Sequence, residues 1–145
     1  MKKQNKIKNI IYTAGVIIDN TPDRVFNYNA WPNKYVDHMT IQYGGLKKKP
    51  AYIGKLFTFI ATHAVSDEKG VAWLGHIDDK TIEKKMKEIG QHAHVTLFTA
   101  EGVGPVYSNE LMKTAQWHKL ARPVAIKMMA GMFVAYEDGS TGWEF

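Results

Sequence analysis

A short pattern occurs twice in this chain and restricts the folds open to it. His38-Met39-Thr40-Ile41 reads as histidine, any residue, threonine and a hydrophobic residue, and His94-Val95-Thr96-Leu97 reads the same way. Because alternate side chains of a β-strand point to one face, each histidine would share a face with its threonine. Two such strands side by side would bring two imidazoles and two hydroxyls to one cleft.

Most of the remaining chain also favours strands. Runs rich in apolar and β-branched residues predict strands at Ile10–Ile18, Val36–Tyr43, Lys55–Val65, Val71–Ile77 and Ala93–Thr99, and one or two more over Val124–Tyr136. A polar loop that ends at Gly70 joins Lys55–Val65 to Val71–Ile77, so these two strands are predicted to form a hairpin. Antiparallel pairing is therefore expected to dominate the sheet.

Three helices are predicted between these strands. A short one begins near Pro22 and ends at about Tyr28, and a second covers Asp79–Ile89, where apolar residues recur at helical spacing. The third begins at Glu110, with Ser108 or Asn109 as its cap, and ends near Leu120. The expected architecture is α+β, built on antiparallel sheet, in a single domain over residues 1–145.

Composition limits the chemistry and the setting. The chain has no cysteine, which excludes disulfides, thiolate catalysis and cysteine-based zinc sites, and which suits a cytoplasmic protein. A formal net charge of +5 favours anionic ligands such as nucleotides. No apolar stretch reaches the roughly 18 residues of a membrane-spanning helix, so no membrane association is expected.

The paired motif carries the equipment for acid–base chemistry on a phosphodiester. One imidazole would remove a proton from the attacking hydroxyl or water, and the other would protonate the departing oxygen. The hydroxyls of Thr40 and Thr96 would stabilise the negative charge that builds on the phosphate oxygens. His38 and His94 are therefore the predicted acid and base, and the sequence leaves open which of them plays each part. No metal or other cofactor is required.

Further residues are candidates for substrate binding. Gln42 shares the strand face of His38 and Thr40 in an alternating strand and is expected to bond the phosphate or a base. Ser108 is a candidate donor to phosphate. Three aromatic residues are candidates for stacking on a base: Tyr12, Tyr107 and Trp143. His92 and His94 have a spacing that a metal can use, but no third ligand follows at a suitable spacing, so no metal site is expected.

The two motifs make the chain resemble the 2H phosphoesterase superfamily, the LigT-like group. That resemblance implies a bilobal α+β fold with pseudo-twofold antiparallel sheets, flanking helices and a central cleft. It also implies metal-independent cleavage of cyclic phosphates or related nucleotide bonds by His38 with Thr40 and His94 with Thr96. The loop from Gly102 to Asn109 also resembles the loop after the second motif in some bacterial and phage members.

Within that superfamily, small size and basicity favour branches that act on small nucleotides. One such branch is the phage anti-CBASS nucleases, which destroy cyclic oligonucleotide signals and would act in the host cytoplasm. Another cleaves 2′,3′-cyclic phosphate ends of RNA. A non-catalytic sponge that binds a nucleotide in the same cleft is the alternative from another class, and a basic RNA-binding protein is a third.

Overall fold

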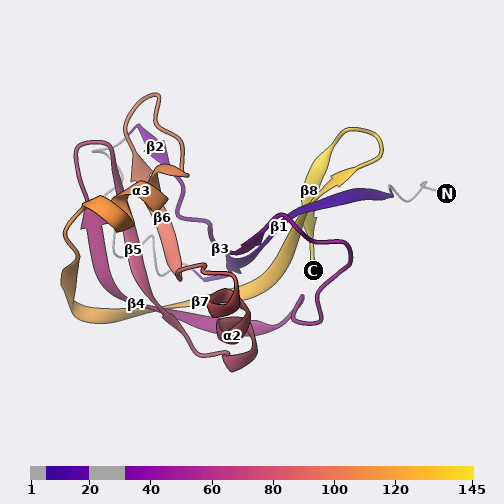
Figure 1. Ribbon diagram of the computed structural model, residues 1–145, viewed down its shortest axis with the longest axis horizontal. Coiled ribbons are helices and arrows are strands. Elements are labelled where there is room, and N and C mark those ends of the chain that lie inside the picture. Colours follow the sequence, from indigo (N-terminus) through magenta and orange to yellow (C-terminus); the bar gives the residue numbers. More distant parts are fainter. Residues whose placement is uncertain (1–5, 20–31) are drawn as a thin grey trace.

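The fold is built on one antiparallel sheet with two helices, seen in a computed structural model that describes residues 6–19 and 32–145 (Figure 1). Eight strands are present in this described part of the chain, in the order β2-β6-β5-β4-β7-β1-β3, and β8 also pairs with β7. Their bounds are β1 Ile7–Ile17, β2 Asn33–Lys34, β3 His38–Tyr43, β4 Leu56–Ser66, β5 Gly70–Ile77, β6 His94–Thr99, β7 His118–Tyr136 and β8 Thr141–Glu144. The helices are α2 Lys80–Glu88 and α3 Tyr107–Thr114. The predicted α+β class is confirmed.

Local sequence signals account for the connections on both sides of β5. The Asp67 carboxylate accepts hydrogen bonds from the backbone N–H groups of Lys69 and Gly70, which closes the predicted β4–β5 hairpin. Asp79 caps α2 by accepting from the Ile82 N–H, and Gly90, at φ 72°, ends it in the left-handed conformation. The hairpin and the 79–89 helix are thus confirmed.

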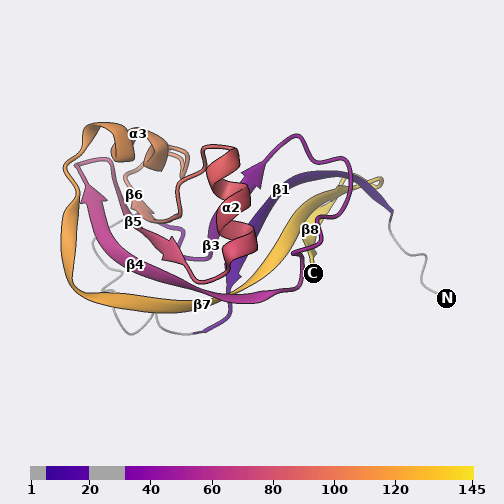
Figure 2. The same cartoon turned by 60° about the horizontal axis from the view of Figure 1, so that its bottom comes forward.

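Strand β7 joins the two halves of the sheet. Its first part pairs with β4 and its second part with β1, and around Met128 and Met129 it pairs with both. Figure 2 shows β4 and β7 running together along the curved base of the molecule, with both helices on the same side of the sheet. The sheet therefore curls as a half-barrel around its helix-bearing face.

The core lies between the curled sheet and α2. Buried side chains from the strands, such as Phe59, Val95 and Ile126, form one cluster with Ile82 and Met86 of the helix. Leu111 of α3 completes a smaller cluster over β4 and β5. These contacts fix both helices against the sheet and so fix the segments that follow them.

The short segment of residues 33–37 connects the two ends of the sheet. At one end β2 pairs with β6, and the Tyr35 N–H donates to Leu97 O at 2.8 Å. At the other end the Ile17 N–H donates to Asp37 O at 3.0 Å, immediately before β3 pairs with β1. Strand β3 also contacts β6. The strands that carry the repeated motif therefore meet although they belong to opposite ends of the sheet.

One predicted helix differs from the structure in its bounds, and another lies outside the described residues. The third helix was expected from Glu110 to about Leu120 with a side-chain cap, but α3 begins at Tyr107, follows Val106 without a side-chain cap and ends at Thr114. Residues 118–120 instead belong to β7, because His118 and Lys119 pair with β4. The short helix expected to end near Tyr28 lies outside the described residues. No helix in the described ranges is long and apolar enough to cross a membrane.

Candidate active site

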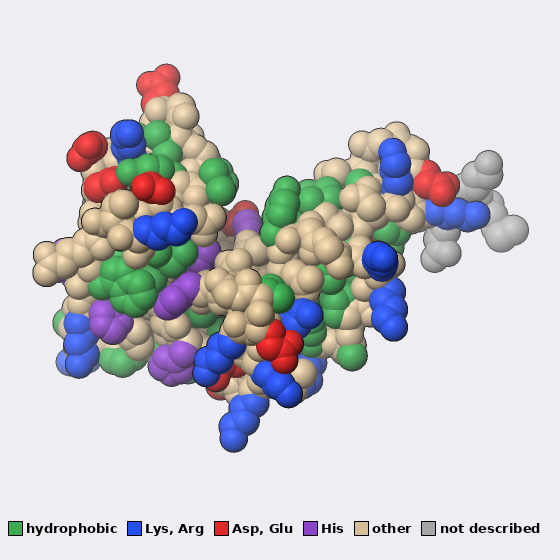
Figure 3. All heavy atoms as spheres, in the orientation of Figure 1, with side chains coloured by type: hydrophobic (Ala, Val, Ile, Leu, Met, Phe, Trp, Pro, Cys, Tyr) green, Lys and Arg blue, Asp and Glu red, His purple; other side chains and the backbone are tan. Residues whose placement is uncertain are grey.

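Both copies of the repeated motif line one cavity of about 410 Å³. His38 and Thr40 reach it from β3, and His94 and Thr96 reach it from β6. In Figure 3 the surface is hollowed between its two lobes, and histidine and acidic atoms are visible at the bottom of the hollow. The structure thus brings the four motif residues to a common space.

Strand alternation explains why these side chains face the cavity. The residues between and after them are buried in the core: Met39 and Ile41 in β3, and Val95 and Leu97 in β6. Because neighbours in a strand point to opposite faces, anchoring the apolar positions in the core turns the histidines and threonines the other way. The hydrophobic positions of the motif therefore orient its polar ones.

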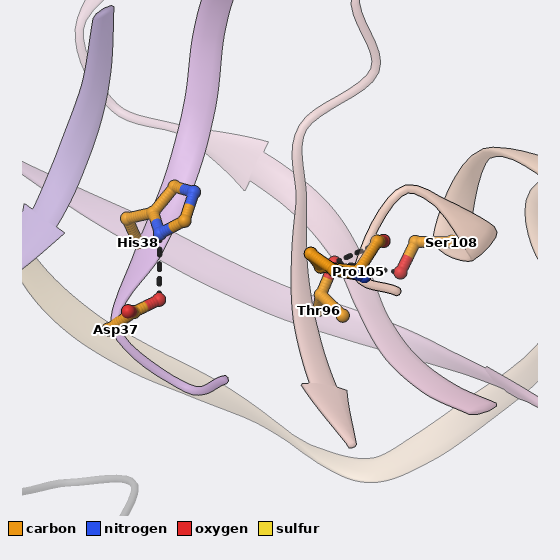
Figure 4. A network of polar contacts seen from close by, with 5 residues as sticks. All are labelled: Asp37, His38, Thr96, Pro105 and Ser108. Atoms are coloured by element: carbon orange, nitrogen blue, oxygen red, sulfur yellow. Dashed lines mark hydrogen bonds and ion pairs between the residues drawn. The ribbon is translucent and has the colours of Figure 1, made fainter. Parts of the chain in front are cut away.

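His38 is held by a carboxylate. Its Nδ1 lies 2.7 Å from Oδ1 of Asp37, and the two form an ion pair when the imidazole is protonated (Figure 4). The Tyr12 ring stacks against the imidazole at a centroid distance of 5.5 Å. Since the ionised carboxylate only accepts, Nδ1 carries a hydrogen and Nε2 is the nitrogen left for a ligand.

His94 has a different environment, because it is 8 % exposed and bonded to a neutral group. Its Nδ1 donates to the His92 carbonyl oxygen at 2.9 Å. Burial lowers the pKa of the His94 imidazole below its usual 6.5; the nearby charges of His92 and His38 add to this lowering, which the hydrogen bond to the carbonyl opposes. A neutral His94 with its hydrogen on Nδ1 presents the lone pair of Nε2.

The two threonines also differ. Thr96 Oγ1 lies 2.7 Å from Ser108 Oγ and 3.4 Å from the Pro105 carbonyl oxygen, so the start of α3 holds its hydroxyl (Figure 4). Ser108 itself is 2 % exposed. Within the described residues Thr40 makes no side-chain hydrogen bond. The second motif is thus supported by a neighbouring hydroxyl, whereas the first leaves its hydroxyl available.

Aromatic rings form one side of the cavity. Tyr12 and Tyr43 stack at 5.9 Å, and Tyr35 also lines the cavity. Trp143 packs edge-on against Tyr12 at 5.7 Å, so it supports this side from behind without lining the cavity. Burial and the charge of Asp37 raise the pKa of Tyr12 above its usual 10.0, which keeps the phenol protonated. Tyr12 already stacks on His38, Tyr43 and Phe133, so the exposed ring of Tyr43 is the one that offers a face to a ligand.

Three other predicted binding residues lie outside the cavity lining. Gln42 donates to the Gly44 carbonyl oxygen at 3.3 Å, while its Oε1 is buried without a partner in the described part. The Tyr107 hydroxyl donates to Asp67 at 2.6 Å, and this bond raises the pKa of Tyr107 to about 12. Ser108 contacts Thr96 and does not line the cavity. Of the predicted binding residues, only Tyr12 contributes directly to the lining.

A register shift accounts for the position of Gln42. The pairing of β1 with β3 slips between Thr13 and Ala14, whose partners are Gln42 and Thr40. Such a bulge interrupts the alternation of side chains. Tyr43 rather than Gln42 therefore joins His38 and Thr40 in lining the cavity, and 74 % of its surface is exposed.

Sequence reasoning missed several lining residues besides Tyr35 and Tyr43. Asp37, Gln91 and Asn109 also line the cavity, with Pro105 and Val106 from the loop before α3. Asp37 directly precedes the first motif, and this adjacency was the available signal for it. Nothing local marked Gln91 or Asn109, because long-range packing of α2 and α3 carries them to the cavity.

The described residues offer little to a metal ion. No group of three histidine, aspartate or glutamate side chains is placed to hold one within residues 6–19 and 32–145. His92 and His94 are separated by one residue, and the Nδ1 atom of each faces a backbone carbonyl oxygen. The polar groups in this cavity are thus imidazoles, hydroxyls, carboxamides and one paired carboxylate.

Comparison with protein-family models and with curated protein sequences finds no match to this chain.

Proposed function

We propose that this chain is a metal-independent phosphodiesterase of the 2H type, which cleaves a small cyclic nucleotide or cyclic oligonucleotide in the cytoplasm, or in the host cytoplasm if the chain is viral. The observation that carries the proposal is that both histidine–threonine pairs line one cavity. The arrangement of the motif strands at opposite ends of a curled sheet suits the bilobal, pseudo-twofold architecture of that superfamily.

His94 is the general base in this proposal. Its lowered pKa keeps the imidazole neutral near pH 7, and Nε2 holds the free lone pair. It takes the proton from the attacking hydroxyl or water as that oxygen forms its bond to phosphorus. A protonated His94 would instead be buried near two other imidazoles, with no carboxylate bonded to it among the described residues.

His38 is the general acid. Its protonated ring has an ion-pair partner in Asp37, which also fixes the orientation of the ring. Nε2 then gives its proton to the oxygen that leaves as the phosphorus–oxygen bond breaks. Thr40 donates to a non-bridging oxygen, whose charge grows in the transition state. Thr96 does the same while it accepts from Ser108 Oγ, its hydrogen turning from the Pro105 carbonyl oxygen to the phosphate.

The size and lining of the cavity favour a small substrate. About 410 Å³ lies within the usual range of small-molecule sites, roughly 300–1,000 Å³. The exposed ring of Tyr43 would stack on a base, as aromatic side chains do in single-stranded nucleic acid sites. These features support a nucleotide-sized ligand.

The pH dependence of kcat/KM follows from the protonation of His94, the proposed general base. Because protonation removes the lone pair of His94 and burial lowers its pKa, kcat/KM is expected to persist as the pH falls through 6.5 and to decline only below it. A pH profile of kcat/KM measures this acidic midpoint, and His118→Gln, at an exposed position, should leave it unchanged. A midpoint above 6.5 would contradict the assignment of His94.

Ser108 is expected to act through Thr96. Ser108→Ala removes the hydroxyl that orients Thr96, and a lost hydrogen bond of about 1.4 kcal/mol would lower kcat about tenfold with little change in KM. In a Thr96→Val background the same change should have no further effect, because the group it positions is gone. Thr114→Val, elsewhere on α3, is the matched control. Equal losses in both backgrounds would contradict the coupling.

The test is a substrate panel. Purified protein in excess EDTA is incubated with 2′,3′-cyclic mononucleotides, cyclic dinucleotides, cyclic trinucleotides and RNA with a 2′,3′-cyclic phosphate end, and products are separated by HPLC. The proposal expects cleavage of at least one small cyclic member. Cleavage of the RNA end alone would assign the chain to the other branch, and no cleavage at all would contradict the proposal.

Mass spectrometry of the ligand released after incubation distinguishes a sponge from an enzyme. An enzyme returns a linear or ring-opened product, whereas a sponge returns the ligand intact.

A further inference from the structure

Two carboxamides line the cavity without hydrogen-bond partners among the described residues. Asp37 is bonded to His38, and Thr96 to Ser108, so these groups are already held. The side chains of Gln91 and Asn109, by contrast, make no hydrogen bond within the part of the chain that the structure describes, although both line the cavity. Polar groups left unpaired in a cavity are available to a ligand.

The backbones beneath these carboxamides are fixed by the elements that hold the second motif. Gln91 follows the turn that ends α2, and its N–H donates to the Met86 carbonyl oxygen at 2.9 Å. Asn109 follows Ser108 in the first turn of α3, and its N–H donates to Val106 O at 3.1 Å. Both side chains therefore start from backbone positions that the ends of α2 and α3 hold in place.

Their chemistry suits the edge of a nucleobase. A carboxamide offers donors and an acceptor side by side and carries no charge, which matches the adjacent donor and acceptor atoms on a base edge. No lysine or arginine is among the described residues that line the cavity, so these carboxamides are better suited to an uncharged base than to a second phosphate. Tyr43, which lines the same cavity and is exposed, provides the complementary contact with the face of the base.

The geometry points to Gln91 and Asn109 as the residues that determine base specificity, by hydrogen bonding to the edge of a nucleobase whose face stacks on the exposed ring of Tyr43. This inference rests on the proposed function and names the part of the substrate that the cavity reads. It separates the reacting groups from the recognising ones: the histidines and threonines act on the phosphate, and the carboxamides select the base.

The experiment compares bases. Dissociation constants for the 3′-monophosphates of adenosine, guanosine, cytidine and uridine are measured by calorimetry for the wild type and for Gln91→Ala and Asn109→Ala. The wild type is expected to prefer one base, and each alanine variant to lose about tenfold of that preference, the equivalent of one hydrogen bond of about 1.4 kcal/mol. Glu88→Ala, at the end of α2 before Gln91, and Glu110→Ala, beside Asn109 on α3, should keep the wild-type preference.

A charge variant sharpens the comparison. Gln91→Glu and Asn109→Asp replace the donor by a second acceptor, so binding should shift toward guanosine, whose edge presents two neighbouring donors. Unaltered base ratios in all four variants would overturn the inference, and the phosphodiesterase would still stand if the wild type turns over the panel. A wild type that binds none of the four nucleotides overturns the inference, and one that also cleaves nothing overturns the proposed function with it.

Discussion

Replacing either cavity histidine by asparagine is expected to lower kcat/KM by about 10²–10⁴-fold, the usual contribution of a positioned general acid or base. Asparagine has a similar polar character but does not exchange a proton near neutral pH. The measurement is kcat/KM on the best member of the substrate panel, for His38→Asn and His94→Asn. His118→Asn, at an exposed position on β7, is the control and should retain wild-type activity.

The leaving group distinguishes the two roles. A p-nitrophenyl phosphodiester releases a stable anion and does not need protonation as it departs. His38→Asn should therefore recover most of its activity on that substrate, whereas His94→Asn should not. Recovery of both variants, or of His94→Asn alone, would contradict the assignment of acid and base. Circular dichroism of each variant verifies that the fold persists.

The largest expected loss of stability follows from Gly75→Ala. Gly75 lies on β5 opposite a slip in the pairing with β4, and a Cβ there would overlap the Ile60 carbonyl oxygen and crowd the Ala61 backbone. Because these obstacles are backbone atoms inside a paired sheet, they have little freedom to move. We expect the free energy of unfolding to fall by about 3 kcal/mol or more, measured by urea denaturation.

Gly104→Ala is the matched control for this change. A Cβ at Gly104 would meet no atom within 4 Å, and the residue needs no left-handed backbone. Its stability should stay within about 1 kcal/mol of the wild type, because the same side chain is added without a clash. Equal stability of both variants would mean that β4 and β5 do not approach each other as described.

Local patterns were sufficient for much of the fold. Polar residues and a glycine between two apolar runs predicted the β4–β5 hairpin, and capping with apolar spacing predicted α2. Each signal is contained within one continuous stretch of the chain. The sequence predicted that residues 118–120 would belong to the third helix, but they begin β7. No local signal indicates this, because pairing with the distant strand β4 decides it.

The same division applies to the candidate site. Alternation within two short strands predicted that each histidine accompanies its threonine, and the structure places all four beside one cavity. The contribution of Tyr43 in place of Gln42 depends on a bulge between β1 and β3, which no local signal marked. Gln91 and Asn109 reach the cavity through the packing of helices, so their part in the lining required the tertiary structure.

Turnover of a small cyclic nucleotide in excess EDTA, followed by HPLC, tests directly whether the two imidazoles perform the chemistry. It is measured for the wild type and for the double variant His38→Asn/His94→Asn. If the two imidazoles perform the chemistry, the wild type forms product without metal and the double variant, although folded, forms none. Product formation by the double variant at the wild-type rate, or activity of the wild type that EDTA abolishes and added metal restores, would contradict the account.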